Sequence, residues 1–453
     1  MIEKIKKFFK IEERNSSIKI ELLGGLTTFL TMAYILFANP AIMGGLITLE
    51  DGSSLQLVAG LDLQAVFLAT ALAAGIGTIA MGLFAKLPIA VAPGMGLNAF
   101  FSFTIVVGMG YSWEQALGAV LVSGILYLII SLTGLRAKVV ASIPQSLKYA
   151  IGAGIGFFIA YIGLVNVGII VQGAGTPTSL GDLSSPVALL ALFGIVLTIV
   201  LLALKIRAAV FFGLVGTATV GLIVGLLGVV GMPVLPDFQG GLPSLAPLFG
   251  AAFGGAFDII LTPAGWFAIF AFLFVDFFDT SGTLMAVTGQ MEDVTEEDIQ
   301  RANVVDSSAT VIGAVLGTST TTSYIESLSG VGAGARTGLA SVFTGLLFLL
   351  SIFLAPLLSL VTAGVTAAAM VIVGTMMAAS IGKIEWDKWP IAIASFITIL
   401  VMILTYSISD GIGFGFLTYI LVMLASKRGK DVSPLLYGAG VLFILYLVLM
   451  TVM

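Results

Sequence analysis

Long apolar segments with almost no charge follow one another through this chain, and they restrict its fold more than any other feature. Of the 453 residues, 59% are hydrophobic and only 9% are charged, whereas soluble domains carry about 25% charged residues. A hydropathy window of about 19 residues selects segments that can cross a bilayer as helices. The sequence therefore predicts an all-α polytopic membrane protein. The predicted spans are 20–39, 64–84, 87–107, 115–133, 147–168, 186–204, 208–230, 262–287, 300–316, 318–333, 337–357, 365–381, 389–407 and 410–426.

The basic residues test this number of fourteen spans. With the N-terminus inside, all 19 Lys and Arg residues fall in the predicted cytoplasmic segments, and the opposite loops contain none. Cytoplasmic loops carry the excess of Lys and Arg, and one miscounted span would invert everything downstream. We therefore predict a multi-pass protein of the cytoplasmic membrane with its N-terminus inside. The cytoplasmic segments are 1–19, 85–87, 134–148, 204–208, 288–301, 334–337, 382–388 and 427–434.

Two segments lie outside the fourteen spans. Residues 1–19 are charged and amphipathic and lack a small-residue cleavage pattern, so we expect the first span to be an uncleaved anchor. The apolar stretch 435–452 fits either a fifteenth span or a helix lying on the membrane, and the sequence does not decide between them.

Spans 3 and 10 are predicted to be interrupted. Residues 92–98 read Ala-Pro-Gly-Met-Gly-Leu-Asn, and residues 317–323 read Gly-Thr-Ser-Thr-Thr-Thr-Ser. Irregular backbone at bilayer depth survives only where it is buried in protein or lines a cavity. These segments are each the third of a seven-span half, and because seven is odd the two halves would be inverted repeats. Interrupted segments at matching positions indicate a substrate site near the bilayer midplane.

Carboxylates lie inside these apolar spans. A charge at bilayer depth costs at least about 2.5–3.5 kcal/mol and is usually functional. The spans that hold Asp276, Asp279 and Glu326 contain no Lys or Arg, and the chain has no Cys and no His. The predicted site is therefore acidic. It favours a neutral or cationic substrate that donates hydrogen bonds, and it can carry protons. No cofactor, no metal centre and no nucleic-acid partner is expected.

The acids have both functional and structural interpretations. Asp276 and Asp279 are three residues apart and share one helical face, which Thr283 continues. Glu326 precedes an expected half-helix, where an acid can also serve as a cap. Likewise, Asn98 either satisfies backbone groups of a broken helix or binds a ligand. Asp306, in span 9, is either structural or part of a proton path.

Four motifs resemble the signature blocks of the AzgA-like adenine, guanine and hypoxanthine permeases, within the nucleobase–ascorbate transporter superfamily. The resemblance extends from the first span through at least the fourteenth. The motifs are Met32-Ala33-Tyr34-Ile35 to Asn39-Pro40, Ala92-Pro93-Gly94-Met95-Gly96-Leu97-Asn98-Ala99-Phe100-Phe101, Phe278-Asp279-Thr280-Ser281-Gly282-Thr283-Leu284 and Thr320-Thr321-Thr322-Ser323-Tyr324-Ile325-Glu326-Ser327.

The resemblance implies two inverted seven-span repeats that form a core domain and a gate domain. The core domain would comprise 20–133 and 262–357, and the gate domain 147–230 and 365–426. Residues 1–19 and 435–452 would be an N-terminal cytoplasmic segment and an extra C-terminal segment. It also implies proton-coupled uptake of a purine base, bound between short β-strands in spans 3 and 10.

The resemblance carries the superfamily's binding acids to Asp279, which Gly282 follows three residues later, and to Glu326. The relative roles of Asp276 and Asp279 stay open. Phe100, Phe101, Phe277 and Phe278 are candidates for stacking on the base. Proton coupling is assigned to Asp276, Asp279 and Glu326. The whole predicted substrate site is Asp279, Glu326, Asp276, Asn98, Thr283, Thr322, Ser323, Ile325, Gly96 and Phe100.

Other classes fit less well. Carriers of uracil, an amino acid or a metal cation would also use buried acids, whereas an anion carrier would avoid them. A membrane aspartyl protease needs acids in Tyr-Asp and Gly-x-Gly-Asp contexts, which are absent. A channel would not need interrupted inverted repeats. The preferred purine, the coupling ion and the assembly, including a homodimer, stay open.

Overall fold

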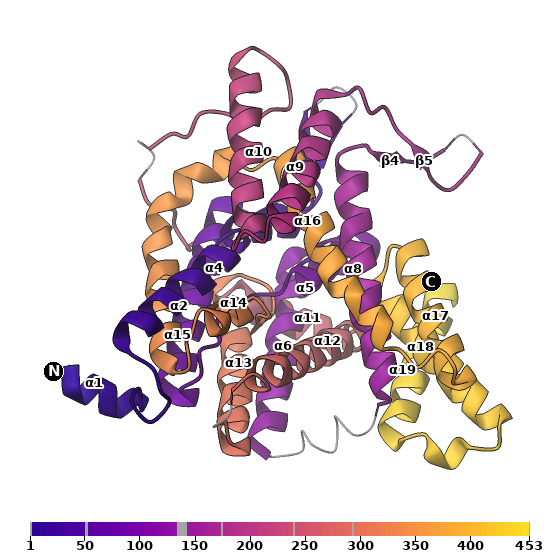
Figure 1. The fold of residues 1–453 in the computed structure, drawn as a ribbon. Coiled ribbons are helices and arrows are strands. Elements are labelled where there is room, and N and C mark those ends of the chain that lie inside the picture. The colour runs from indigo at the N-terminus through magenta and orange to yellow at the C-terminus, as the bar shows by residue number, and fades with distance from the viewer. Residues whose placement is uncertain are drawn as a thin grey trace.

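The computed structural model describes residues 2–49, 53–133, 143–173, 175–238, 241–291 and 294–452, without the side chains of Phe278 and 449–452. It is a helical bundle with short strands (Figure 1). The strands are β1 (Leu46–Thr48), β2 (Ser54–Gln56), β3 (Val91–Pro93), β4 (Ile170–Val171), β5 (Ser179–Leu180) and β6 (Thr321–Ser323). The helices are α1 (Ile2–Phe9), α2 (Ile18–Met32), α3 (Ile35–Met43), α4 (Leu63–Ala80), η1 (Met81–Ala85), α5 (Met95–Ala99), η2 (Phe100–Gly108), α6 (Trp113–Thr133), α8 (Gln145–Asn166), α9 (Pro186–Ala203), α10 (Ala209–Leu226), α11 (Ala251–Ile260), α12 (Pro263–Thr288), α13 (Glu296–Leu316), α14 (Ser327–Gly332), α15 (Gly338–Leu350), η3 (Ser351–Leu360), α16 (Ala363–Ala378), η4 (Ala379–Lys383), α17 (Trp389–Leu404), α18 (Ile408–Ala425), η5 (Gly429–Asp431) and α19 (Pro434–Val452).

Ten helices of the described ranges are long and apolar enough to cross a membrane. Polar residues at the ends of the apolar segments fix where several of these helices begin. The Thr262 side chain accepts from Gly265 N at the start of α12, where Pro263 occupies the first turn. Thr295 and Asp298 form a capping box at the start of α13. The sequence thus sets the helix ends as well as the apolar spans.

The structure differs from the sequence prediction in several places, among them the strand pairs β1–β2 and β4–β5, which lie outside spans 3 and 10. The first span, predicted as continuous over 20–39, is divided into α2 and α3 at Ala33–Tyr34. The predicted loop 231–261 contains α11, which is apolar but too short to have been selected as a span. This short helix crosses α6 so closely that a Cβ at Gly255 would lie 1.7 Å from Glu114 O. Glycine is therefore required at this crossing.

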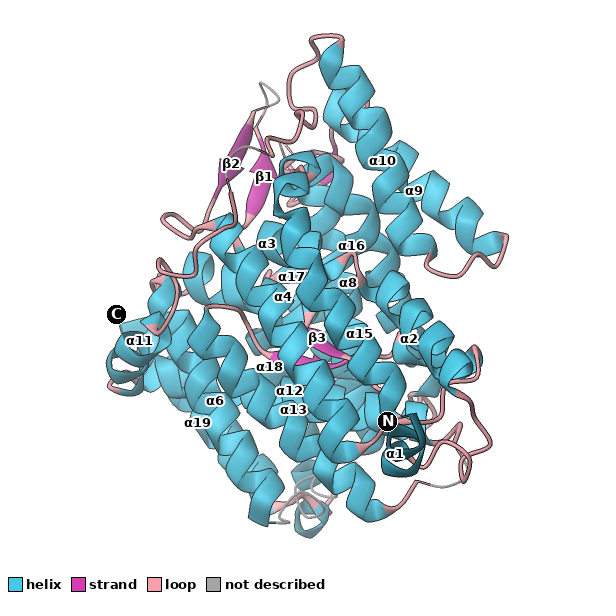
Figure 2. Ribbon diagram, turned by 90° about the vertical axis from the view of Figure 1, so that its left-hand side faces the viewer, coloured by secondary structure: helices cyan, strands magenta, loops and turns pink. Residues whose placement is uncertain are grey.

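The predicted strands in spans 3 and 10 are confirmed. Strands β3 and β6 pair antiparallel, with Val91 opposite Ser323 and Pro93 opposite Thr321. The pairing is extended by Gly94 N to Thr320 O at 2.9 Å and by Tyr324 N to Ala90 O at 3.0 Å. Figure 2 shows β3 in the interior, surrounded by helices. The strand pair therefore satisfies backbone groups in a region where water is scarce.

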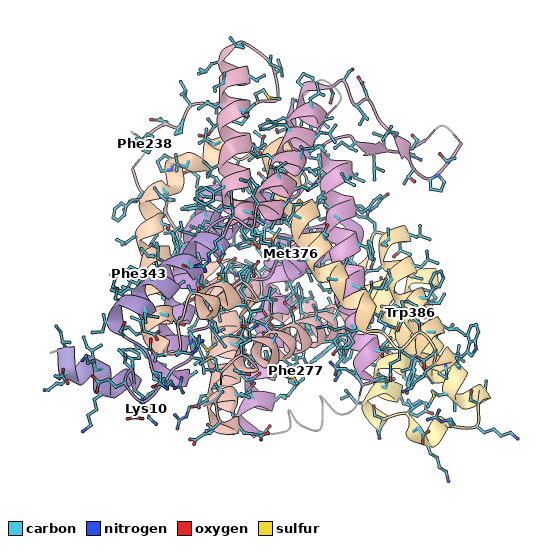
Figure 3. The ribbon with its side chains drawn as sticks, in the orientation of Figure 1. Lys10, Phe238, Phe277, Phe343, Met376 and Trp386 are labelled. Carbon is cyan, nitrogen blue, oxygen red and sulfur yellow. The ribbon has the colours of Figure 1, made fainter. Side chains whose placement is uncertain are left out.

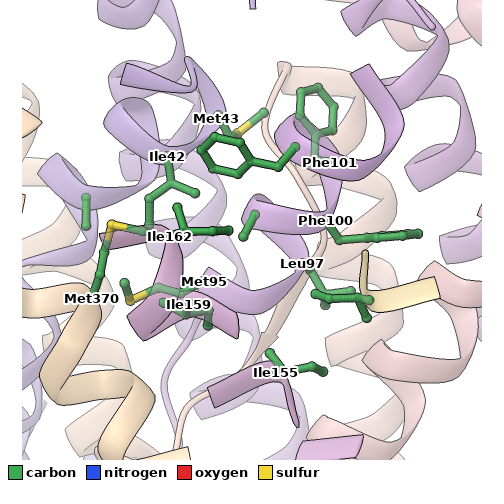
Figure 4. Close-up of a cluster of buried hydrophobic side chains, with 14 of the residues drawn as sticks. Ile42, Met43, Met95, Leu97, Phe100, Phe101, Ile155, Ile159, Ile162 and Met370 are labelled. Carbon is green, nitrogen blue, oxygen red and sulfur yellow. The ribbon is translucent and has the colours of Figure 1, made fainter. Parts of the chain in front are cut away.

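The helices separate into two packing groups. One contains α2, α3, α4, α6, α11, α12, α13, α14 and α15, and the other contains α8, α9, α10, α16, α17 and α18. The groups meet at an apolar seam, where Met95, Leu97 and Phe100 lie near Ile155 and Ile159 of α8 (Figure 4). Met95 and Leu97 belong to α5, the short helix that follows β3, so α5 forms part of this seam.

Helix α19, formed by the leftover segment 435–452, packs against α12 and α18. The Phe267 ring of α12 stacks on Tyr446 with centroids 4.6 Å apart, and Phe414 of α18 meets Phe443 edge-on at 5.3 Å. These aromatic contacts connect one helix of each packing group through the C-terminal segment.

A buried carboxylate connects the N-terminal segment to the loop between α14 and α15. Glu21 is fully buried, and its Oε1 accepts from Ser16 Oγ at 2.6 Å and from Arg336 N at 3.0 Å. Its Oε2 accepts from Thr337 N at 3.2 Å. Arg14 donates to Arg336 O at 3.0 Å and to Lys86 O at 3.1 Å. Both strand-bearing segments are therefore held at the same end of the molecule.

We predict that Glu21→Ala lowers the free energy of unfolding by about 2–4 kcal/mol, because it removes the acceptor of two buried backbone N–H groups. Glu21→Gln keeps one carbonyl oxygen as an acceptor and should lower the free energy of unfolding by less. Thermal unfolding of the purified protein measures both changes. Glu13→Ala, at an exposed position, is the control and should leave the melting temperature unchanged. Equal melting temperatures for Glu21→Ala and this control would contradict the assignment.

Candidate functional site

The candidate site surrounds the β3–β6 pair. Each strand leads into a short helix, α5 or α14, and the side of the pair is covered by α12 and α13. Four acids of the described residues gather here: Asp276 and Asp279 on α12, Asp306 on α13, and Glu326 before α14. None of the ion pairs found in the described ranges involves them. Hydroxyl groups rather than cations are their partners.

Asp306 is the centre of a hydroxyl network. It is fully buried, and its two carboxylate oxygens accept from Thr280 Oγ1 and Ser323 Oγ, each at 2.7 Å. The Thr280 hydroxyl also meets the Thr322 hydroxyl at 2.8 Å. Asp306 therefore joins α12 and α13 to strand β6. Sequence reasoning left its role open, and this geometry shows that it holds the strand.

Asp276 is buried on the side of α12 that faces α13. Thr310 Oγ1 lies 3.1 Å from Asp276 Oδ2 and donates to Thr321 O at 2.7 Å. Asp276 Oδ1 has no protein partner among the described residues. The side chain is only 1% exposed, so it lies behind the strand rather than at an open surface.

Asp279 has a different environment from Asp276, although the two share one helix. Its side chain is exposed, and Gly282 is exposed one turn further on. A Cβ at Gly282 would meet nothing within 4 Å, and Met285 is 62% exposed. An uncovered stripe therefore leads from Asp279 towards the C-terminal end of α12. Figure 3 shows the neighbouring Phe277 in the middle of the molecule.

Glu326 is half-buried at the start of α14. Its Oε1 accepts from Tyr34 Oη at 2.9 Å. Tyr34 comes from the break between α2 and α3 and is 1% exposed. A second polar contact, Thr31 Oγ1 to Ser329 Oγ at 2.9 Å, lies beside it. Tyr34 belongs to the first of the four motifs, but the sequence did not place it in the site; a tyrosine inside an apolar span was the available signal.

Several buried polar side chains of the site have no protein partner among the described residues. Both side-chain polar atoms of Asn98 belong to this set, although the residue is fully buried. The hydroxyls of Ser319, Thr320 and Thr321 belong to it as well. Buried polar groups are normally hydrogen-bonded, so these atoms are free to bond a small polar molecule or water. Their position beside the strands favours the binding interpretation of Asn98.

The remaining predicted residues have varied surroundings. Ile325 is 41% exposed and Thr283 is 7% exposed. Phe100 is fully buried and meets Phe272 edge-on at 4.8 Å. A Cβ at Gly96 would lie 2.5 Å from Ile155 Cγ2, so this glycine permits α5 to approach α8. Phe101 and Phe277 are also buried, and the side chain of Phe278 lies outside the described residues.

Interrupted helices that meet through paired strands, together with acids inside apolar helices, are the features of a secondary transporter. The chain matches the Permease family over residues 19–414. It is 49% identical over 447 residues to the guanine/hypoxanthine permease PbuG of Bacillus subtilis, covering 98% of this chain and 99% of that protein. It is 38% identical to the adenine permease AdeQ of Escherichia coli, covering 98% and 96%. The chain therefore belongs to this permease family and is an integral multi-pass membrane transporter, not an enzyme.

Solved structures show the same fold at low sequence identity. The transmembrane domain of the cyanobacterial bicarbonate transporter BicA matches with a TM-score of 0.63 at 16% identity, covering 86% of this chain and 96% of that one. Murine Slc26a9, an anion transporter in its inward-facing state, also matches at 0.63, with 12% identity and coverages of 93% and 72%. The fold is thus shared with a bicarbonate transporter and an anion transporter.

We predict that Thr280→Val lowers the free energy of unfolding by about 2–3 kcal/mol, because it leaves Asp306 Oδ2 buried without its hydroxyl donor. Thr280→Ser keeps the hydroxyl and should lower the free energy of unfolding by much less. The measurement is thermal unfolding in detergent. Thr219→Val removes an exposed hydroxyl that bonds only its own helix backbone and is the matched control. A Thr280→Val protein as stable as the control would show that the network does not hold the strand.

Proposed function

We propose that this protein takes up purine nucleobases across the cytoplasmic membrane by proton-coupled alternating access. The names of the relatives support the substrate class, since PbuG is a guanine/hypoxanthine permease and AdeQ an adenine permease. The observation that carries the proposal is the site beside the β3–β6 pair. There the exposed Asp279 and the half-buried Glu326 accompany unpartnered polar groups such as Asn98.

The chemistry of a purine suits these groups. A purine presents ring N–H donors, and adenine and guanine add an exocyclic amino group, which carboxylates accept in charge-assisted hydrogen bonds. Asp279 and Glu326 are the proposed acceptors. Asn98 and the hydroxyls of the Ser319–Thr321 run would meet the ring acceptors. They replace the predicted Thr322 and Ser323, whose hydroxyls bond Thr280 and Asp306. Asp276, buried behind the strand, has a supporting role in this arrangement.

The proposed architecture has two inverted seven-span repeats followed by one further span, with the N-terminus in the cytoplasm. The group that contains α2–α6 and α11–α15 would be the core domain, and the group that contains α8–α10 and α16–α18 the gate domain. The antiparallel pairing of β3 with β6 suits two repeats that enter from opposite sides. Because α19 packs on both α12 and α18, we place 435–452 within the membrane as a fifteenth span rather than on its surface.

The exposed stripe of α12 indicates which side the site faces. It runs from Asp279 through Gly282 and Met285 towards the end of α12 at Thr288. The distribution of the Lys and Arg residues supports a cytoplasmic position for that end. The described conformation would therefore be open to the inside, and reorientation would slide the apolar seam of α5 past α8.

Binding is tested by substituting the acids. We predict that Glu326→Gln and Asp279→Asn nearly abolish uptake of labelled hypoxanthine, guanine and adenine by a strain without its own purine permeases. Asp276→Asn should be milder, because its side chain does not face the open stripe. Surface expression of each variant is the control, and labelled uracil tests the neighbouring substrate class. Wild-type uptake by Glu326→Gln, or loss confined to Asp276→Asn, would refute these roles.

Proton coupling is tested separately in vesicles. The chain has no His, so we expect the proton carrier to be a carboxylate. The candidates are Asp276, Asp279 and Glu326, and Asp306 is a further one. Adjacent carboxylates in a low dielectric do not all ionise easily, and a bound proton cancels charge during reorientation. An inward proton gradient without sodium should accumulate a labelled purine, and a protonophore should abolish this accumulation. Accumulation that requires sodium and ignores the pH gradient would contradict proton coupling.

A further inference from the structure

We propose that Tyr34 is a positioning and specificity-determining residue of the site: its hydroxyl fixes the Glu326 carboxylate so that one N–H donor of the base suffices for tight binding. This inference rests on the proposed purine uptake. Its basis is the 2.9 Å hydrogen bond from Tyr34 Oη to Glu326 Oε1. Apart from Tyr34 and the backbone N–H of Glu326 itself, no donor of the described residues bonds this carboxylate.

Tyr34 is held in place by close packing. Helices α2 and α14 approach so closely that a Cβ at Gly330 would lie 2.2 Å from Thr28 Oγ1 and 2.7 Å from Gly24 O. The Thr31–Ser329 hydroxyl contact lies one turn away. Because the break at Ala33–Tyr34 sits on this fixed interface, the phenol hydroxyl has a defined position relative to the start of α14. The break in the first span therefore contributes a residue to the site, as the β3–α5 and β6–α14 segments do.

The hydrogen bond restricts how Glu326 can meet a base. A free carboxylate rotates and must be ordered by its ligand, and this ordering lowers affinity. Tyr34 orders the carboxylate before binding. A base with a single N–H at the contact therefore binds without a loss of affinity for ordering this group. A base with two adjacent donors, such as guanine with N1–H and its amino group, can bond both carboxylate oxygens. Such a two-point contact would orient the carboxylate without help from Tyr34.

The test is equilibrium binding of labelled hypoxanthine and guanine to the purified full-length protein. Tyr34→Phe keeps the ring and removes only the hydroxyl. Since a hydrogen bond to a charged group is at stake, hypoxanthine affinity should fall about tenfold to a hundredfold, and guanine affinity should fall clearly less.

The matched control is Tyr127→Phe. Tyr127 is also fully buried and donates to a side chain, Asn303 Oδ1 at 3.1 Å, but it lies on α6 and its partner lies on α13, so its hydroxyl does not bond Glu326. Its substitution should change neither affinity. Equal losses for both bases, or no loss for either, would overturn the role of Tyr34. Failure of the wild-type protein to bind either base would instead refute the proposed function.

Discussion

The pairing of β3 with β6 is the interaction on which the rest of the structure depends. Two spans give up helical hydrogen bonds in the middle of an apolar bundle, where an unsatisfied backbone group costs several kcal/mol. Each strand supplies the other's partners, and Gly94 continues the contact to Thr320. A Cβ at Gly94 would lie 2.8 Å from Thr322 Cγ2, so glycine is needed for this approach. Short helices can then begin on both sides of the pair.

The strand pair also determines how the acids are used. Asp306 is occupied by the hydroxyls of Thr280 and Ser323, and Asp276 lies behind the pair beside Thr310. These two acids brace the strand against α12 and α13. Asp279 and Glu326 remain at the exposed or half-buried edge. In this account, the buried acids maintain the irregular backbone that the outer acids need in order to meet a substrate.

The sequence predicted much of this arrangement because its strongest signals are local. Proline and glycine at 93, 94 and 96 and the hydroxyl run 318–323 mark the interrupted spans, and the acids stand out in apolar surroundings. The break at Ala33–Tyr34 was missed because no glycine or proline lies between Gly25 and Pro40 to mark it. Helix α11 was missed because it is shorter than a span.

Contacts between distant segments could not be predicted from the sequence. The spacing of Asp276 and Asp279 places both on one face of α12, but only the neighbouring helices decide that Asp276 is buried and Asp279 exposed. The Tyr34–Glu326 bond joins residues 292 positions apart. The same holds for Asp306, whose hydroxyl partners come from α12 and β6. Tertiary packing, rather than local pattern, assigns these roles.

A crystal or cryo-EM structure of the purified protein with a bound purine would locate the base directly. We predict that the base lies between α5 and α14, beside the strand pair, with Glu326 and Asp279 within hydrogen-bonding distance of its N–H groups. Asp306 should keep its contacts with Thr280 and Ser323. A base bound elsewhere, or bound beside the strands without contact to either outer acid, would contradict the account.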